Sequence, residues 1–130
     1  MKLTKKQKEL NKKEKHKLTK SYAKQQARKE IKLKDKEWQL AVKERDEFKC
    51  AICGRTDILH VHHLIPREDK LFRWLIENGV TLCPLHHKYS LEISAHRNAF
   101  AFYIWFINNR VKQYLMLLDH YNKIYKPLIN

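Results

Sequence analysis

The chain has 130 residues, enough for one domain and an appendage, and its 28 Lys and Arg against 14 Asp and Glu give a formal net charge of +14. The basic start is not followed by an apolar run with a cleavage site, and no apolar stretch is long enough to cross a bilayer, so we expect neither a secretory signal nor a membrane span. Three cysteines, two of them two residues apart, indicate metal binding in a reducing compartment rather than disulfides. We therefore expect a cytosolic or nuclear protein.

Most of the positive charge lies in residues 1–36, which carry 15 Lys or Arg and four acidic residues, a net charge of +11. This segment has no Gly or Pro and only scattered apolar residues, which is typical of a solvated helix or of a disordered arm that becomes ordered on a partner. The sequence leaves both open. Such a charge favours a polyanion as the partner of this segment, most commonly nucleic acid, over a membrane surface. The alternative is that the segment is only a solubilising tail.

Residues 34–48 fit a short helix, because Trp38 and Val42 lie one turn apart and can both face a core. The apolar and β-branched run at 58–65 predicts a strand that Pro66 ends, and residues 80–82 predict a second strand. Between the strands we expect a polar loop with a helical turn near residues 71–76 and Gly79 as its cap.

Pro84 suits the first turn of a helix that would carry two neighbouring histidines, His86 and His87. From residue 98 to Tyr121, aromatic and aliphatic side chains recur at helical spacing, which predicts one or two amphipathic helices broken near Asn108 and Asn109. Pro127 is expected to end the regular structure. We interpret the aromatic stripe as core packing or as a homodimer face and assign it no chemistry.

The predicted fold class is therefore α+β: a small core of two strands and a helix, bound together by metal, at residues 37–97, a basic arm at residues 1–36 and a helical extension at residues 98–130 that packs on the core.

All three cysteines, six of the eight histidines and both glycines fall between residues 50 and 96. Structural zinc is bound by four sulfur or nitrogen ligands, usually as two pairs from two turns of the chain. The two spacings of that kind, Cys-x2-Cys and Cys-x2-His, predict a zinc site at Cys50, Cys53, Cys83 and His86. Zinc binding would also help so short a unit to fold.

The other histidines are too many for that site. His62 and His63 are neighbours on a predicted strand, where successive side chains point to opposite faces, so we expect one to bind metal and the other to face a substrate. His60 shares the parity of His62 but is interpreted as an exposed strand residue.

In these motifs the chain resembles the HNH (ββα-metal, His-Me finger) endonuclease family. The resemblance covers about residues 38–97, and it rests on residues 45–46 before the first cysteine pair, on 61–67, on Asn78 five residues before Cys83, and on 83–87. Residues 94–96 and 102–105 also resemble small HNH proteins of phages. The resemblance implies action in the cytoplasm of a bacterium or of a phage-infected host.

The resemblance also implies roles for matching residues. His63 matches the general base that activates water against a phosphodiester, and His62 and His87 match ligands of a catalytic divalent ion such as Mg²⁺ or Mn²⁺. Asn78 matches a residue that braces the loop bearing the base. Arg67 is placed to contact a phosphate, although an ion pair with a neighbouring acid is the alternative.

Two departures from the family pattern affect the metal ligands. Many members have a cysteine at the position of His86, although imidazole can also bind zinc. Many members also have a histidine or asparagine at the position of Leu91, so the third ligand of the catalytic ion falls to His96 through a longer loop. The sequence leaves this assignment open.

We therefore expect a metal-dependent DNA endonuclease with a structural zinc ion. A non-catalytic, zinc-finger-like nucleic-acid-binding module is the alternative, and a protein-interaction platform built on the C-terminal helices is a third reading. Nothing in the sequence indicates the DNA target, nicking against double-strand cutting, RNA cleavage or the biological pathway.

Overall fold

The structure is a computed structural model, and it describes residues 1–125, so the end expected at Pro127 lies outside the described residues. The chain forms two compact units, Met1–Lys36 and Glu37–Asn130. Helix α1 (Lys5–Arg45) runs through the first unit and ends in the second. None of the helices described combines the length and apolar composition that a membrane span requires.

The first unit is helical, which is one of the two conformations that its sequence left open. Every residue from 1 to 34 is exposed, and the buried residues of α1 are Trp38 and Val42, near its C-terminal end. The segment therefore buries no core of its own.

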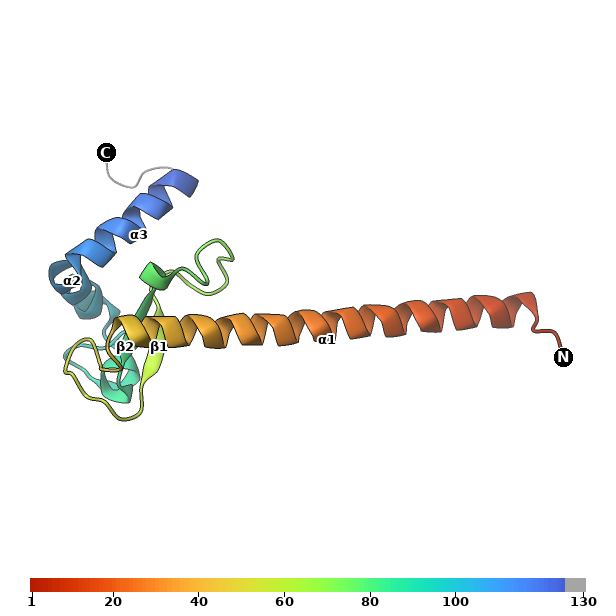
Figure 1. The fold of residues 1–130 in the computed structure, drawn as a ribbon, viewed down its shortest axis with the longest axis horizontal. Helices are drawn as coiled ribbons and strands as arrows, with labels where there is room; N and C mark the ends of the chain where they lie inside the picture. Colours follow the sequence, from red (N-terminus) through yellow and green to blue (C-terminus); the bar gives the residue numbers. More distant parts are fainter. Residues whose placement is uncertain (126–130) are drawn as a thin grey trace. The chain divides into compact units, whose positions relative to one another are not determined.

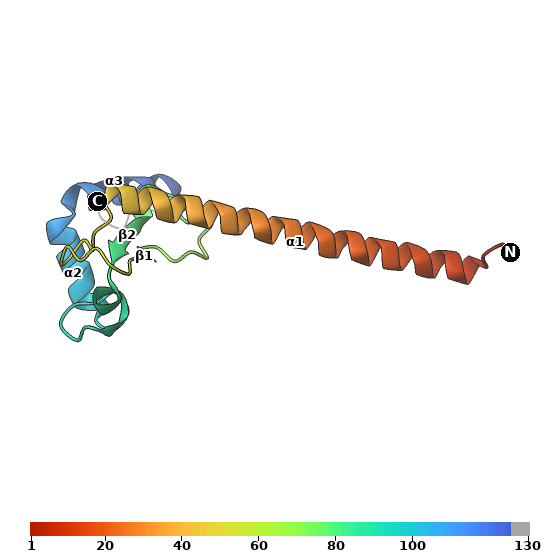
Figure 2. The ribbon, with the colours of Figure 1, turned by 60° about the horizontal axis from the view of Figure 1, so that its bottom comes forward.

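The second unit is built on a two-stranded antiparallel sheet of β1 (His60–His63) and β2 (Gly79–Leu82), which lie side by side in both views (Figures 1 and 2). The strands pair in register from His60 opposite Leu82 to His63 opposite Gly79. All four residues of β2 are buried, whereas His60 is exposed and the rest of β1 is half-buried. β2 is therefore the inner strand, and β1 presents its histidines at the edge of the core.

β1 is shorter than the strand predicted at 58–65. Ile58 has a φ of 45° and is 65% exposed, so the chain turns just before the pairing begins. The helical turn predicted near residues 71–76 lies later in the chain: residues 71–74 form simple turns, and the 3-10 turn η1 (Ile76–Asn78) follows them. After β2 the predicted helix is a single π-turn, η2 (Leu85–Tyr89), closed by a hydrogen bond from the Ser90 N–H to the Leu85 carbonyl.

Gly79 caps the 3-10 turn as predicted, with its N–H donating to the Ile76 carbonyl, but it does not adopt the left-handed conformation for which a glycine cap is usually chosen. Its backbone has φ −120° and ψ 147°, an extended conformation open to any residue. A Cβ at this position would lie 2.6 Å from a methyl carbon of Val42 and 2.7 Å from the Trp38 ring. Gly79 is therefore the place where the end of α1 packs directly against the sheet.

The C-terminal part of the chain forms α2 (Ala99–Asn109) and α3 (Val111–Ile124), which meet at an angle (Figure 1). The break falls at Arg110, next to the predicted position. Phe102, Phe106 and Leu117 are the buried members of the aromatic and aliphatic stripe. They join a core with Phe72, Val80 and Leu82, so the helices pack over the sheet and its loop. The predicted α+β fold class, with a small metal-site core and flanking helices, is confirmed.

Candidate metal centres

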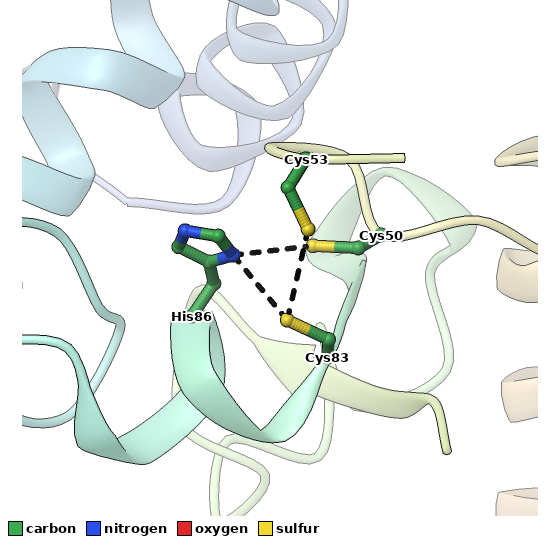
Figure 3. A group of neighbouring side chains, drawn as sticks. All are labelled: Cys50, Cys53, Cys83 and His86. Atoms are coloured by element: carbon green, nitrogen blue, oxygen red, sulfur yellow. Dashed lines mark hydrogen bonds between the residues drawn. The ribbon is translucent and has the colours of Figure 1, made fainter. Parts of the chain in front are cut away.

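Three cysteines and one histidine converge between the turn that follows α1 and the turn that follows β2 (Figure 3). The Ala51 N–H donates to the Thr81 carbonyl at 2.9 Å, which ties the first turn to β2. Gly54, with a φ of 75°, lets the chain reverse just after the first pair of cysteines. These four residues are the ones that the sequence spacing predicts as one set of ligands: Cys50, Cys53, Cys83 and His86.

The donor atoms of this cluster have the spacing of a zinc tetrahedron. Sγ of Cys53 lies 3.8 Å from Sγ of Cys83, and Nδ1 of His86 lies 3.7 Å from Sγ of Cys50 and 3.3 Å from Sγ of Cys83. Zn–S bonds of about 2.3 Å and Zn–N bonds of about 2.0–2.1 Å imply tetrahedral edges of about 3.8 Å between sulfurs and about 3.6 Å between sulfur and nitrogen. The cluster is therefore compatible with a closed, structural zinc site.

The local electrostatics favour the metal-binding forms of Cys50 and His86 but not that of Cys53. Burial alone would raise the pKa of the Cys50 thiol, but backbone hydrogen bonds at Cys53, Cys83 and Ile52 outweigh burial and lower the pKa. Burial and the neighbouring Cys50 raise the pKa of Cys53. Burial also lowers the pKa of His86, which favours the neutral ring that metal binding requires.

A second cluster contains His62 of β1, His87 of η2 and His96 of the segment before α2. One ring nitrogen of each lies within 4.8 Å of those of the other two. Nε2 of His96 and Nε2 of His87 are 3.1 Å apart, and the ring of His62 lies 4.9 Å from that of His96 between centroids. The structure thus brings together the three histidines expected to bind a catalytic ion.

His96 reaches this cluster through backbone pairing. The Ala95 N–H donates to the His86 carbonyl at 2.9 Å, and the His96 N–H donates to the His87 carbonyl at 3.0 Å. Leu91, at the position where the family has a ligand, is 70% exposed and belongs to neither metal cluster. The longer loop therefore folds back and places His96 beside His87.

Two of these histidines are neutral at neutral pH. Burial, reinforced by the neighbouring His87 and His96, lowers the pKa of His62 to about 3. Burial and the neighbouring His96 lower the pKa of His87 to about 4. Because a neutral imidazole offers a lone pair, the donor chemistry fits a divalent ion.

His63 points away from this cluster, as the alternation of side chains along a strand predicts. Its ring stacks on Trp38, with 4.0 Å between centroids and 14° between planes. Its Nε2 lies 3.0 Å from the carbonyl oxygen of Arg73. Because a carbonyl can only accept, Nε2 carries the proton in the neutral ring and Nδ1 is the basic nitrogen.

The side chain of Asn78 is fully buried and holds the loop after β1. Its Oδ1 accepts from the Ile65 N–H at 2.6 Å, and its Nδ2 donates to the carbonyls of Ile65 and Phe72, each at 3.0 Å. The Asn78 carbonyl also accepts from the Leu64 N–H. One amide thus fixes both ends of the segment that follows His63.

A hollow of about 480 Å³ lies over these histidines. Its lining includes His62, His63 and Arg67. Arg67 is exposed, and its Nε lies 3.7 Å from the Glu68 carboxylate, a distance typical of a weak surface pair. His60 is exposed and its ring lies 5.3 Å from that of His87, outside the second cluster.

Two contributors were missed from the sequence. Trp38 donates its Nε1–H to the Leu75 carbonyl at 2.7 Å while stacking on His63, so it fixes the His63 ring and the loop together. Tyr103 donates its hydroxyl to the Leu64 carbonyl at 2.7 Å. The spacing of Trp38 and Val42 predicted burial but did not indicate which residue the ring would contact.

Residues 50–89 match the family model described as HNH endonuclease. No curated protein and no solved structure was found to match the chain. The matched segment includes His62, His63 and Asn78 but ends before His96, so the position of His96 in the second cluster rests on the structure alone.

Proposed function

Because residues 50–89 match the HNH endonuclease family model, we propose that the protein is a metal-dependent endonuclease that hydrolyses DNA phosphodiester bonds, with His63 as its general base. The observation that carries the proposal is the arrangement of His62 and His63. These neighbours on β1 face opposite ways: His62 faces a cluster of metal-binding side chains, and His63 faces the Arg73 carbonyl, which sets its tautomer. Both border one hollow.

In this proposal His63 accepts a proton from the attacking water. With Nε2–H held by the Arg73 carbonyl, Nδ1 takes a proton from a water molecule as the water oxygen attacks phosphorus. The imidazolium that forms keeps its hydrogen bond to that carbonyl. The Trp38 ring against which His63 stacks limits its rotation, so the base is held in one orientation.

His62, His87 and His96 would hold a divalent ion, which when bound stabilises negative charge on the phosphate and on the leaving oxygen. The donor chemistry narrows the choice of metal. Imidazole suits zinc, nickel, copper and iron, whereas magnesium prefers oxygen ligands. Of the ions expected from the sequence, Mg²⁺ is therefore the weaker candidate, and a transition-metal ion is favoured.

The remaining residues support this chemistry. The zinc cluster, with donors from the turn after α1 and from the turn after β2, contributes folding free energy rather than catalysis. Asn78 braces the loop between Ile65 and Phe72, and Arg67 at the rim of the hollow contacts a phosphate. These are positioning and binding roles.

Two further expectations accompany the proposal. Ile104, Ile107 and Leu115 remain more than two-fifths exposed on α2 and α3, and a homodimer formed through these helices stays a prediction that sedimentation at several concentrations tests. We also expect the protein to act in the cytoplasm, in a bacterium or a phage-infected host.

The test is nicking of a supercoiled plasmid by the zinc-loaded protein and by His63→Ala, across a series of added divalent ions. We expect nicking that requires a transition-metal ion and that falls at least about a hundredfold in the variant, the contribution typical of a general base. Retained zinc and an unchanged circular dichroism spectrum are the controls. An inactive parent protein with every ion would favour the non-catalytic binding module.

A further inference from the structure

Five basic residues of α1 form a single stripe along the helix. With 3.6 residues per turn, the five positions fall within a sector about 80° wide and span about 22 Å of helix length. No other residue between 13 and 28 falls in this sector. All five side chains belong to exposed residues, and we call them the basic stripe: Lys13, Lys17, Lys20, Lys24 and Arg28.

The stripe carries unbalanced charge. The sequence holds no acidic residue between Glu14 and Glu30, and the ion pair between Lys34 and Glu30 lies beyond the stripe. Its members are three or four residues apart, so each like charge faces the next and destabilises an isolated helix. A polyanion along this face would replace that repulsion with attraction.

The apolar residues of the segment argue against a membrane surface. Leu10 and Ile31 lie on the same side of the helix as the basic stripe, whereas Leu18 and Leu33 lie on the opposite side, and all four are exposed. A helix that lies on a bilayer needs one apolar face. This helix has none.

We propose that the basic stripe binds the phosphate backbone of duplex DNA, independently of base sequence. The choice of DNA over other polyanions rests on the proposed function. Along 22 Å a duplex presents about 13 phosphate charges, at one per 1.7 Å, so five cations at roughly one per helical turn find phosphates without a specific register. The stripe thereby keeps the chain on DNA whether or not the histidines cut it.

Two variants of the full chain with equal charge test whether the face or the total charge matters. The first changes the basic stripe to glutamine, which keeps helix propensity high. The second changes five lysines from the other side of the same helix to glutamine, so both variants lose five positive charges. Those control positions are Lys5, Lys8, Lys12, Lys15 and Lys29.

Binding is measured by fluorescence anisotropy of a labelled DNA duplex at several salt concentrations, with zinc-loaded protein and no other divalent ion. Each phosphate contact contributes about −0.9 to the slope of log K against log salt concentration, so we expect the stripe variant to lose up to about 4.5 from the magnitude of that slope. The corresponding fall in affinity is at least about tenfold at 0.1 M salt. The control variant is expected to lose less than half as much of the slope.

Equal losses in the two variants would overturn the proposal, because total charge would then suffice, and so would unchanged binding by the stripe variant. Tighter binding of an RNA duplex or of polyglutamate than of DNA through the stripe would also overturn it. None of these results depends on cleavage. A protein that binds DNA through the stripe but never nicks it would refute the proposed function and leave this inference standing.

Discussion

Replacing Gly79 with alanine tests how the end of α1 packs on the sheet. The added Cβ would lie 2.6 Å and 3.1 Å from the two methyl carbons of Val42 and 2.7 Å from the Trp38 ring. Carbon atoms in contact normally stay about 3.5–4.0 Å apart, so neighbours must move by about an ångström. Val42 and Trp38 are both buried, with exposed fractions of 0% and 4%, and Trp38 donates a hydrogen bond to the Leu75 carbonyl.

Overpacking of this kind typically costs about 1–3 kcal/mol, and the rigidity of both neighbours places Gly79→Ala in the upper half of that range. The assay is denaturant unfolding at a fixed concentration of free zinc, since bound metal contributes to the measured stability. We expect a lower midpoint with an unchanged slope.

A double-mutant cycle with Val42→Ala makes the prediction sharper. This second change removes both methyl groups that the new Cβ would meet, so Gly79→Ala should cost at least about 1 kcal/mol less in that background. Gly54→Ala is the control, because nothing lies within 4 Å of its added Cβ and its cost comes from the φ of 75°. Equal costs of Gly79→Ala in both backgrounds would refute the packing argument.

Two further predictions concern buried polar groups. Asn78→Asp replaces an amide that donates to two carbonyls with a carboxylate that can only accept. We expect stability to fall by about 2–5 kcal/mol in the same unfolding assay. A loss below about 0.5 kcal/mol would contradict the bracing role of Asn78. For Asp46, burial alone would raise the pKa, but hydrogen bonds from Arg45, Arg110 and the Thr81 N–H outweigh it and hold the pKa below 3.8. The ionised Asp46 therefore stabilises the fold above pH 3.8, and this stabilisation is lost as the pH falls through the lowered pKa. Asp46→Asn should reduce the free energy of unfolding at about pH 7 and make that free energy fall less steeply below about pH 4. Parallel pH curves for the parent and this variant would count against the ion pairs.

Local chemistry explains what the sequence predicted well. The ligand pairs at 50/53 and 83/86 each lie in one turn of the chain, so their spacing alone indicates a shared metal. The alternation of side chains along a strand separates His62 from His63 before any tertiary contact is considered. The burial of Trp38 and Val42 follows from their spacing of one helical turn.

The remaining features depend on contacts between distant segments. His96 joins the second cluster because backbone hydrogen bonds pair residues 95 and 96 with residues 86 and 87, and no side-chain pattern encodes that pairing. The contact of Trp38 with His63 depends on how α1 crosses the sheet at Gly79, where the missing side chain was mistaken for a conformational requirement. The predicted division into domains at residues 1–36, 37–97 and 98–130 and the homodimer stay predictions.

If one metal cluster holds the fold and the other cuts DNA, zinc content and nicking should respond to different substitutions. Both are measured on the same preparations of the parent, Cys83→Ser and His96→Ala. We predict one zinc per chain that persists through dialysis in the parent and in His96→Ala, and zinc loss with unfolding in Cys83→Ser. His96→Ala should need a higher concentration of the added divalent ion for half-maximal nicking. An unchanged ion requirement in His96→Ala, or zinc loss from it, would contradict the division between the two clusters.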